Sequence, residues 1–229
     1  LNESQAGRLK DAGLDRINIS LDSLQPTRFH EITRTGHLSD VLAGIEAAQQ
    51  VGFQRIKLNT VILRHRNDDE ILDLVDFVRQ QQLDLAFIEE MPLGDINDHQ
   101  RADTYISNEE VRQRIAAAHP LLSALDNTGG PARYYRMADS NSRIGFISPH
   151  SHNFCGDCNR VRVTAEGRLL LCLGNEHSAD LRSPMRQNAD DDQPLINTIM
   201  QALPLKPERH YFNVDEPPQI VRFMNMTGG

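Results

Sequence analysis

The sequence lacks any run of apolar residues that approaches the roughly 20 needed for a helix to cross a bilayer, which excludes a membrane-spanning segment. It is also short of positive charge, with 24 Lys and Arg against 32 Asp and Glu and a formal net charge of −8. That deficit argues against a broad nucleic-acid-binding face and against docking on anionic lipid. A local basic pocket remains compatible with this balance. We expect a cytoplasmic protein without a nucleic-acid or membrane partner.

One nucleotide-binding signature and one hydrolase signature are missing. Without a G-x-x-x-x-G-K-[ST] loop, a bound nucleotide would have to be held by side chains. Without G-x-S-x-G, catalysis by a serine triad has no support. Cysteine is scarce too: Cys155, Cys158 and Cys172 fall within eighteen residues. An odd number of cysteines, close together in the sequence, indicates an intracellular metal site rather than a disulfide framework.

Residues 1–95 alternate strand and helix patterns. Helices are predicted from about residue 41 and, after a capping run at 67–70, from about residue 71. Strands are predicted over 15–21, 55–63 and 83–88. Strands separated by helices pair in parallel, so the predicted fold class is α/β, either part of a (β/α) barrel or a doubly wound sheet. Ligands bind such sheets at the carboxyl ends of the strands, here Ser20, Asn59, Thr60, Glu89 and Met91.

The alternation weakens after Pro92. A capping box formed by Ser107 and Glu110 predicts a helix that runs to about residue 118. Further elements are predicted as strands at 133–137 and 143–147, a hairpin turning at 165–167 and a helix at 195–203. We therefore divide the chain into a barrel segment, residues 1–95, and a C-terminal extension, residues 96–229.

The cysteines form the strongest chemical signal. Cys155 and Cys158 have C-x-x-C spacing, and the hairpin returns Cys172 to the same place. A structural zinc site with His152 or His150 as fourth ligand, an iron–sulfur cluster and unligated thiols all remain open on spacing alone. Three thiolates on a cubane cluster would leave one iron without a protein ligand, free to bind a substrate atom.

Three basic residues are candidates for an anionic ligand. Arg160 and Arg162 lie two residues apart in a strand-like run, so both side chains should project to one face as donors for a phosphate or a purine edge. Lys57 lies in an otherwise apolar strand, where an unpaired ammonium would be costly. If that strand lines a barrel, Lys57 points into the lumen and needs an anion there.

These residues resemble a known family. Residues 153–167, followed by 171–173, closely resemble the C-terminal cluster segment of the radical S-adenosylmethionine GTP 3′,8-cyclases of molybdenum-cofactor biosynthesis. Three further segments, 16–24, 56–61 and 87–94, agree, and so does the double-glycine end at Gly228 and Gly229.

The resemblance implies a partial TIM-type (β/α) barrel with the radical S-adenosylmethionine fold and a cluster-binding C-terminal extension. It implies S-adenosylmethionine and two [4Fe–4S] clusters, of which Cys155, Cys158 and Cys172 hold one. GTP is the substrate, and a cyclic pyranopterin monophosphate synthase acts downstream. A homodimer is also implied. By position, Ser20 and Met91 match contacts to S-adenosylmethionine, whereas GTP contacts match Lys57, Arg160, Val161 and Arg162.

We count Arg160 and Arg162 as catalytic as well, because turnover should fail without them.

Two departures from the family pattern are visible. The C-x-x-x-C-x-x-C motif for the radical-generating cluster is absent, so we expect the C-terminal two-thirds of an enzyme, inactive alone. Ala86 stands where many members carry arginine. The alternative hypothesis is a non-catalytic α/β binding module with a structural Cys₃His zinc site.

Overall fold

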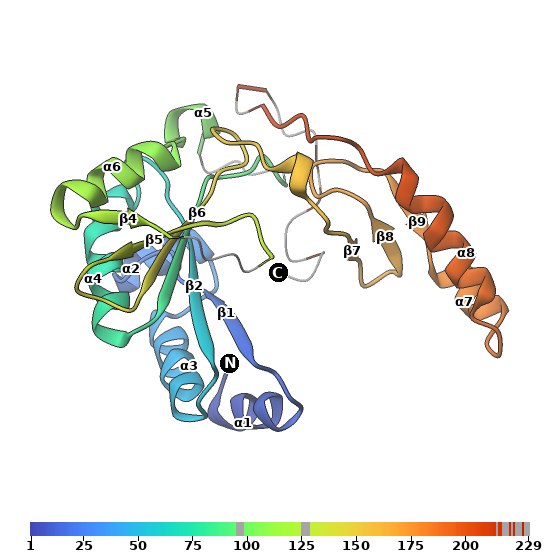
Figure 1. Ribbon diagram of the computed structural model, residues 1–229, viewed down its shortest axis with the longest axis horizontal. Helices are drawn as coiled ribbons and strands as arrows, with labels where there is room; N and C mark the ends of the chain where they lie inside the picture. Colours follow the sequence, from blue (N-terminus) through green and yellow to red (C-terminus); the bar gives the residue numbers. More distant parts are fainter. Residues whose placement is uncertain are drawn as a thin grey trace. The chain divides into compact units, whose positions relative to one another are not determined.

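The computed structural model describes residues 1–94, 99–124, 129–213, 215, 216, 220, 222 and 226, which form two compact units (Figure 1). The first unit comprises Leu1–Glu90 and Asp103–Ser151, and the second comprises Met91–Ala102 and His152–Gly229. Gly228 and Gly229 lie outside the described residues. The division at residue 95 stays a prediction. Among the described helices, none is both long and apolar enough to cross a membrane.

A six-stranded sheet forms the centre of the first unit, in the order β1-β2-β3-β6-β5-β4. The four parallel strands are β1 (Arg16–Ser20), β2 (Arg55–Val61), β3 (Asp84–Ile88) and β6 (Arg143–Ile147). The antiparallel strands are β5 (Arg133–Met137) and β4 (Leu121–Ser123). The α/β class is confirmed. Among the described strands no pairing joins the edge strands β1 and β4, so closure into a barrel stays a prediction.

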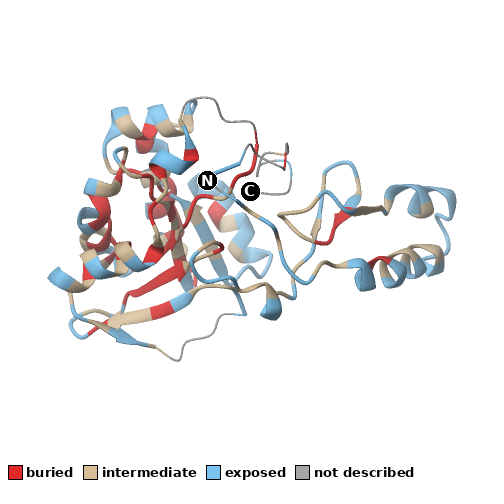
Figure 2. Ribbon diagram, turned by 90° about the horizontal axis from the view of Figure 1, so that it is seen from above, coloured by how far each residue is buried: buried red, intermediate tan, exposed pale blue. Residues whose placement is uncertain are grey.

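The helices of this unit are α1 (Glu3–Asp11), α2 (Pro26–Thr33), α3 (Leu38–Gln50), α4 (Ile71–Gln81) and α6 (Asn108–Ala118), with the 3₁₀ turn η1 (Asp68–Glu70). The short α5 (Arg101–Thr104) spans the point in the sequence where the two units divide. Figure 1 shows α3, α4 and α6 on one side of the sheet. Strand β2 alternates accordingly, with Ile56 and Leu58 buried beneath the helices and Lys57 and Asn59 on the opposite face. Figure 2 shows the buried residues gathered in the sheet and on the adjoining helix faces.

Two predicted helix caps are wrong in detail. The side chain of Asn67 does not cap a helix, because its amide donates to the carbonyls of Asp22 and Val61 at the ends of β1 and β2. Ser107 does accept from the backbone N–H of Glu110, but the Glu110 carboxylate binds Arg64 instead of closing the capping box. The sequence analysis also missed α2, although a proline at its first position is a usual helix-start signal.

The second unit contains a small antiparallel sheet and two helices. The sheet has the order β7-β8-β9, formed by β7 (Arg162–Val163), β8 (Arg168–Leu170) and β9 (Ser178–Asp180). Helices α7 (Arg182–Gln187) and α8 (Gln193–Ala202) follow, with the 3₁₀ turns η2 (Cys155–Asp157) and η3 (Leu203–Leu205). Hairpin β7-β8 confirms the predicted turn at residues 165–167, where Gly167 has φ +80°. Helix α8 confirms the predicted last helix.

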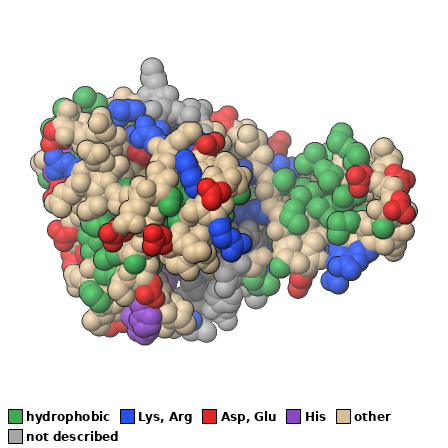
Figure 3. All heavy atoms as spheres, turned by 90° about the horizontal axis from the view of Figure 1, so that it is seen from below, with side chains coloured by type: hydrophobic (Ala, Val, Ile, Leu, Met, Phe, Trp, Pro, Cys, Tyr) green, Lys and Arg blue, Asp and Glu red, His purple; other side chains and the backbone are tan. Residues whose placement is uncertain are grey.

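Helix α8 is apolar on two sides. Ile199 and Ala202 pack on Leu169 and Leu171 in the core of this unit. Ile196 and Met200, one turn apart, are exposed instead. Figure 3 shows apolar side chains gathered on the surface of this part of the chain.

Candidate functional site

A row of polar side chains crosses the face of the sheet opposite the helices. Ser20 at the end of β1 is in register with Asn59 on β2, and Asn59 is in register with Ala86 on β3. Residues paired in this way on parallel strands point to the same face. The Asn59 side-chain oxygen is buried and has no hydrogen-bond partner among the described residues, so it is an acceptor that a ligand could satisfy.

Beyond Asn59, the residues of this row are no longer polar. Ala86 is completely buried, and the next strand continues the row with Gly145. A Cβ on Gly145 would lie 2.8 Å from Cε1 of Tyr134, so the tyrosine ring occupies the space beside it. Position 86 therefore contributes no polar contact, and Ser20 and Asn59 are the polar members of this row.

Lys57 lies two residues before Asn59 on β2, so both side chains belong to the same face of the sheet. Its register neighbour Asp84 is buried and accepts from Arg143 through Nε at 3.1 Å and Nη2 at 2.5 Å. Arg55, two residues before Lys57, approaches the Asp84 carboxylate at 3.5 Å. Two arginines thus contact this one carboxylate, and Lys57 lies beside it in the strand register. This face of the sheet is therefore suited to an anionic ligand.

Two strand-end residues expected to meet a ligand serve the fold instead. The hydroxyl of Thr60 donates to the carbonyl of Leu21 at 2.6 Å. The buried carboxylate of Glu89 accepts from the backbone N–H of Asn108 at 2.9 Å, and from the N–H groups of His150 and Ser151 at 2.9 and 3.0 Å. Both side chains are thus occupied by contacts that hold loops to the sheet. His150, one candidate zinc ligand, donates through Nε2 to the carbonyl of Glu90 at 2.9 Å.

Asp22, a titratable residue just after the end of β1, was not among the predicted site residues. It follows β1, and its Oδ1 accepts from the backbone N–H of Val61 at 2.8 Å. Burial raises the pKa of Asp22 from 3.8 to about 6, against the lowering effect of the Val61 hydrogen bond. The carboxyl thus joins the ends of β1 and β2 at the cost of a buried charge near neutral pH.

Replacing Asp22 by asparagine should stabilise the protein at neutral pH. The folded state binds more protons than the unfolded state between pH 3.8 and 6, so the free energy of unfolding falls as the pH rises through that window. Asp22→Asn keeps an acceptor for Val61 without the charge, and should raise this free energy by up to about 3 kcal/mol at pH 7. Urea unfolding at pH 7 and pH 4 measures it. An equal gain at both pH values would contradict the argument.

The cysteine segment occupies a turn and a hairpin of the second unit. The 3₁₀ turn η2 is closed by a hydrogen bond from the N–H of Cys158 to the carbonyl of Cys155 at 3.1 Å. The Asn153 side chain accepts from the N–H of Cys155 at 2.8 Å. Cys172 follows β8, the second strand of the hairpin. All three thiols are half-buried and none is in a disulfide.

Each sulfur receives a donor from a neighbouring segment. The backbone N–H of His210 donates to Sγ of Cys155 at 3.4 Å, and Nζ of Lys206 donates to Sγ of Cys158 at 3.8 Å. Cys172 accepts from the backbone N–H of Gly174. Hydrogen bonds to the ligating sulfurs are also a feature of iron–sulfur sites. The three thiols therefore fit an iron–sulfur cluster by their donor chemistry.

Gly174 is needed for this arrangement. A Cβ there would lie 2.7 Å from Cβ of His210 and 2.8 Å from the ring of Phe212. The segment of residues 206–212 thus packs directly on the loop after Cys172. The sequence analysis missed this segment, although Lys206 is one of only three lysines in the chain and follows an apolar helix end.

The thiols also influence one another. Burial is the main cause that raises the pKa of Cys172, and the charges of Cys155 and Cys158 raise it further. Among the described residues, no three His, Cys, Asp or Glu side chains form a group that could hold a single metal ion. The cysteines of a cubane bind different irons, so a cluster does not require that convergence. His152, the other candidate zinc ligand, is exposed.

Two of the predicted arginines lie beside these thiols. Burial is the main cause that lowers the pKa of Arg162, repulsion from Arg160 lowers it further, and Cys158 and Cys172 act in the opposite direction. The Arg160 guanidinium lies 5.8 Å from the centre of the Phe154 ring. Val161, between the arginines, is exposed. The structure thus brings the arginine pair and the cysteines together within the second unit.

The remaining predicted residues are divided between the units. Ser20 and Lys57 belong to the first unit and Met91 to the second. Met91 is half-buried, and its carbonyl accepts from the N–H of Leu93 at 2.7 Å.

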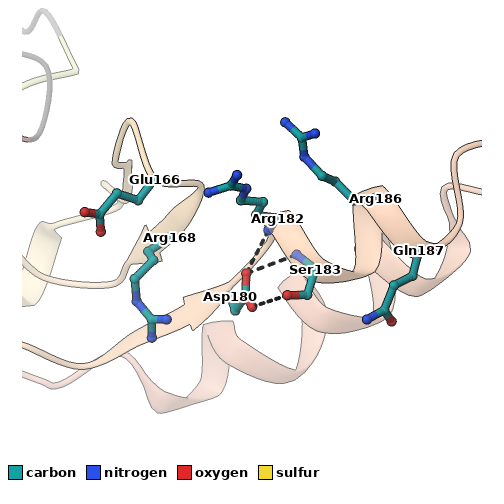
Figure 4. Close-up of a pocket in the computed structure, with 7 residues that line it drawn as sticks. All are labelled: Glu166, Arg168, Asp180, Arg182, Ser183, Arg186 and Gln187. Carbon is teal, nitrogen blue, oxygen red and sulfur yellow. Dashed lines mark hydrogen bonds between the residues drawn. The ribbon is translucent and has the colours of Figure 1, made fainter.

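A hollow of about 590 Å³ lies elsewhere on the second unit and contains none of the predicted residues (Figure 4). Asp180 accepts there from the N–H groups of Arg182 and Ser183, which fixes the start of α7. The guanidinium groups of Arg168 and Arg186 point in different directions, so they do not converge on one ligand. We assign this hollow no part in the site.

Comparisons with known proteins give a consistent result. A family model described as Radical SAM superfamily matches residues 1–78, and one described as Molybdenum Cofactor Synthesis C matches residues 83–212. The chain is 58% identical over 226 residues to a GTP 3′,8-cyclase of Marinobacter nauticus, covering 99% of this chain and 68% of that relative. It is 57% identical over 233 residues to the GTP 3′,8-cyclases of Pseudomonas entomophila and Pseudomonas putida, covering 100% of this chain and 70% of each relative.

Proposed function

This chain belongs to the GTP 3′,8-cyclase family of the radical S-adenosylmethionine superfamily, and we propose that it serves that family's reaction on GTP. The reaction forms (8S)-3′,8-cyclo-7,8-dihydroguanosine 5′-triphosphate and is the first step of molybdenum cofactor biosynthesis. When bound at a second iron–sulfur cluster, S-adenosylmethionine would supply the radical chemistry at the ribose C3′ position. The residues of this chain bind the ligands and orient them.

The observation that carries the proposal is the donor set around the cysteines. Cys155, Cys158 and Cys172 each accept a hydrogen bond from an N–H group. Such contacts fix the positions of the sulfurs that a cluster would bind. In this proposal the three cysteines would hold one [4Fe–4S] cluster, and one iron without a protein ligand would be available to the guanine base.

GTP binding is assigned to the basic side chains. Arg160 and Arg162 lie next to the cysteines, and repulsion between them is relieved when an anion or a purine acceptor binds both. Lys57 lies on the sheet face that carries Arg55 and Arg143, and its positive charge suits a triphosphate. Val161, exposed between the arginines, offers an apolar contact to the ligand.

Ser20 and Met91 are assigned to S-adenosylmethionine. Ser20 lies at the carboxyl end of β1 beside the unsatisfied oxygen of Asn59, where ligands of parallel sheets bind. Met91 comes three residues after the end of β3, and its flexible thioether suits an apolar ligand contact. We also propose a homodimer in the cytoplasm and a cyclic pyranopterin monophosphate synthase that uses the product.

Anaerobic metal analysis tests the proposal. After reconstitution with iron and sulfide, the chain should hold about four irons and four sulfides, with the broad visible absorption of a cubane cluster. One zinc per chain without sulfide would instead support the structural zinc module. Binding of GTP to the reconstituted chain, measured by anaerobic equilibrium dialysis, is the second arm. Loss of GTP binding when the cluster is removed is the expected result.

A further inference from the structure

The ammonium group of Lys206 connects the two segments that carry the cysteines. Lys206 follows η3, and its Nζ donates to the carbonyl of Leu171 at 2.6 Å and to the carbonyl of Arg160 at 2.9 Å. Leu171 precedes Cys172, and Arg160 comes two residues after Cys158. A single side chain therefore ties the turn that carries Cys158 to the strand end that carries Cys172.

The third donor of the same ammonium is directed at sulfur. A lysine ammonium has three N–H donors and no acceptor, and Nζ lies 3.8 Å from Sγ of Cys158. Lys206 is half-buried, so its charge is less screened there than at an exposed position.

Charges and hydrogen bonds near cluster sulfurs set both the retention and the reduction potential of an iron–sulfur cluster. A cation beside the ligating sulfurs favours the state with more negative charge, which is the reduced state. Arg160 and Arg162 are also nearby, but in the proposed function they face GTP, whereas Lys206 is bound to the backbone of the cluster segments.

We propose that Lys206 is a positioning residue for the second cluster: it holds the two cysteine segments in the spacing that the cluster requires, and its charge raises the cluster's reduction potential. This inference rests on the proposed function, because it assumes that Cys155, Cys158 and Cys172 hold a cluster. It adds a residue that contacts neither of the assigned ligands and that lies outside the cysteine and arginine motifs.

The test compares Lys206→Met with Lys206→Arg in the reconstituted full chain. Lys206→Met removes the charge and all three donors with little change in length, whereas Lys206→Arg keeps a charge and several donors. We expect iron release to a chelator to be about 10- to 100-fold faster in Lys206→Met, with a more negative midpoint potential in an anaerobic redox titration. Lys206→Arg should restore most of both properties.

A second measurement needs no destabilised variant. In wild-type chain labelled with ¹⁵N-lysine and reduced to the paramagnetic state, pulsed electron paramagnetic resonance should detect a nitrogen coupling to the cluster. Lys206 is the only lysine of the second unit, and the coupling should vanish in Lys206→Arg. This assigns the signal even if Lys206→Met does not fold.

The outcomes separate the two proposals. A wild-type chain that takes up no iron and sulfide would refute the cluster of the proposed function. A wild-type chain that holds the cluster without a lysine coupling would overturn the Lys206 inference alone. So would a Lys206→Met chain with unchanged iron release and midpoint potential. Faster iron release at an unchanged potential would overturn the electrostatic part of the inference and leave positioning.

Discussion

Replacing Cys158 by serine should abolish cluster retention, with iron and sulfide falling from about four of each per chain to near zero. A hydroxyl is a far weaker ligand for iron than a thiolate, and only three cysteines are present in the chain. Loss of one leaves two protein ligands. Iron and sulfide assays and the visible spectrum measure the effect, and circular dichroism verifies that Cys158→Ser still folds.

The matched control is His152→Ala. In the cluster hypothesis His152 is no ligand, and the variant should keep the iron, the sulfide and the spectrum of the wild type. In the alternative zinc hypothesis His152 completes a Cys₃His site, and the same change should release zinc and unfold the loop. Wild-type metal content in Cys158→Ser would contradict the cysteine assignment itself.

The second large effect concerns GTP. Arg160→Ala and Arg162→Ala should each weaken GTP binding to the cluster-loaded chain by about 10- to 100-fold, because each removes charge-assisted hydrogen bonds worth roughly 1.5–3 kcal/mol. Cluster content should not change, since neither guanidinium has a hydrogen bond to a cysteine sulfur in the described contacts. Anaerobic equilibrium dialysis with labelled GTP measures the affinity. In an active family member, the double variant should lose turnover.

Arg186→Ala is the control for this pair. Arg186 is an exposed arginine of α7 in the same unit, outside the cysteine segment, so its removal changes the net charge equally without touching the site. GTP affinity should stay within about twofold of the wild type at moderate salt. Equal weakening in Arg186→Ala and Arg162→Ala would reduce the arginine pair to a general charge effect and refute its assignment to GTP.

Much of the architecture follows from local patterns. Strand β1 was predicted because its apolar residues alternate after Gly13, and β2 because a β-rich run follows Gly52, where both glycines end the preceding helices. The errors arose where a polar side chain had two possible partners. Asparagine is a common helix-cap residue, yet the Asn67 amide donates to the carbonyls of Val61 and Asp22. Asp22 is 45 residues away in the sequence and comes close only in the folded chain.

The candidate site shows the same limit. The spacing of Cys155, Cys158 and Cys172 predicts that they meet, since a turn and a hairpin are local structures. Thr60 and Glu89 were expected to face a ligand because they end strands, but their side chains satisfy backbone groups of distant segments. Strand-end position alone does not distinguish a ligand contact from a loop anchor.

Local patterns were enough to predict the α/β class, the parallel pairing, the cysteine hairpin and the arginine pair, because each depends on periodicity or on neighbours within about twenty residues. The donors to Cys155 and Cys158, in contrast, come from a segment that is distant in sequence. Lys206 lies 48 residues from Cys158, and His210 lies 55 residues from Cys155. The raised pKa of Asp22 likewise comes from burial, which depends on the whole unit rather than on adjacent residues. Local patterns place the ligands, whereas only the packed chain supplies the charges and hydrogen bonds around them.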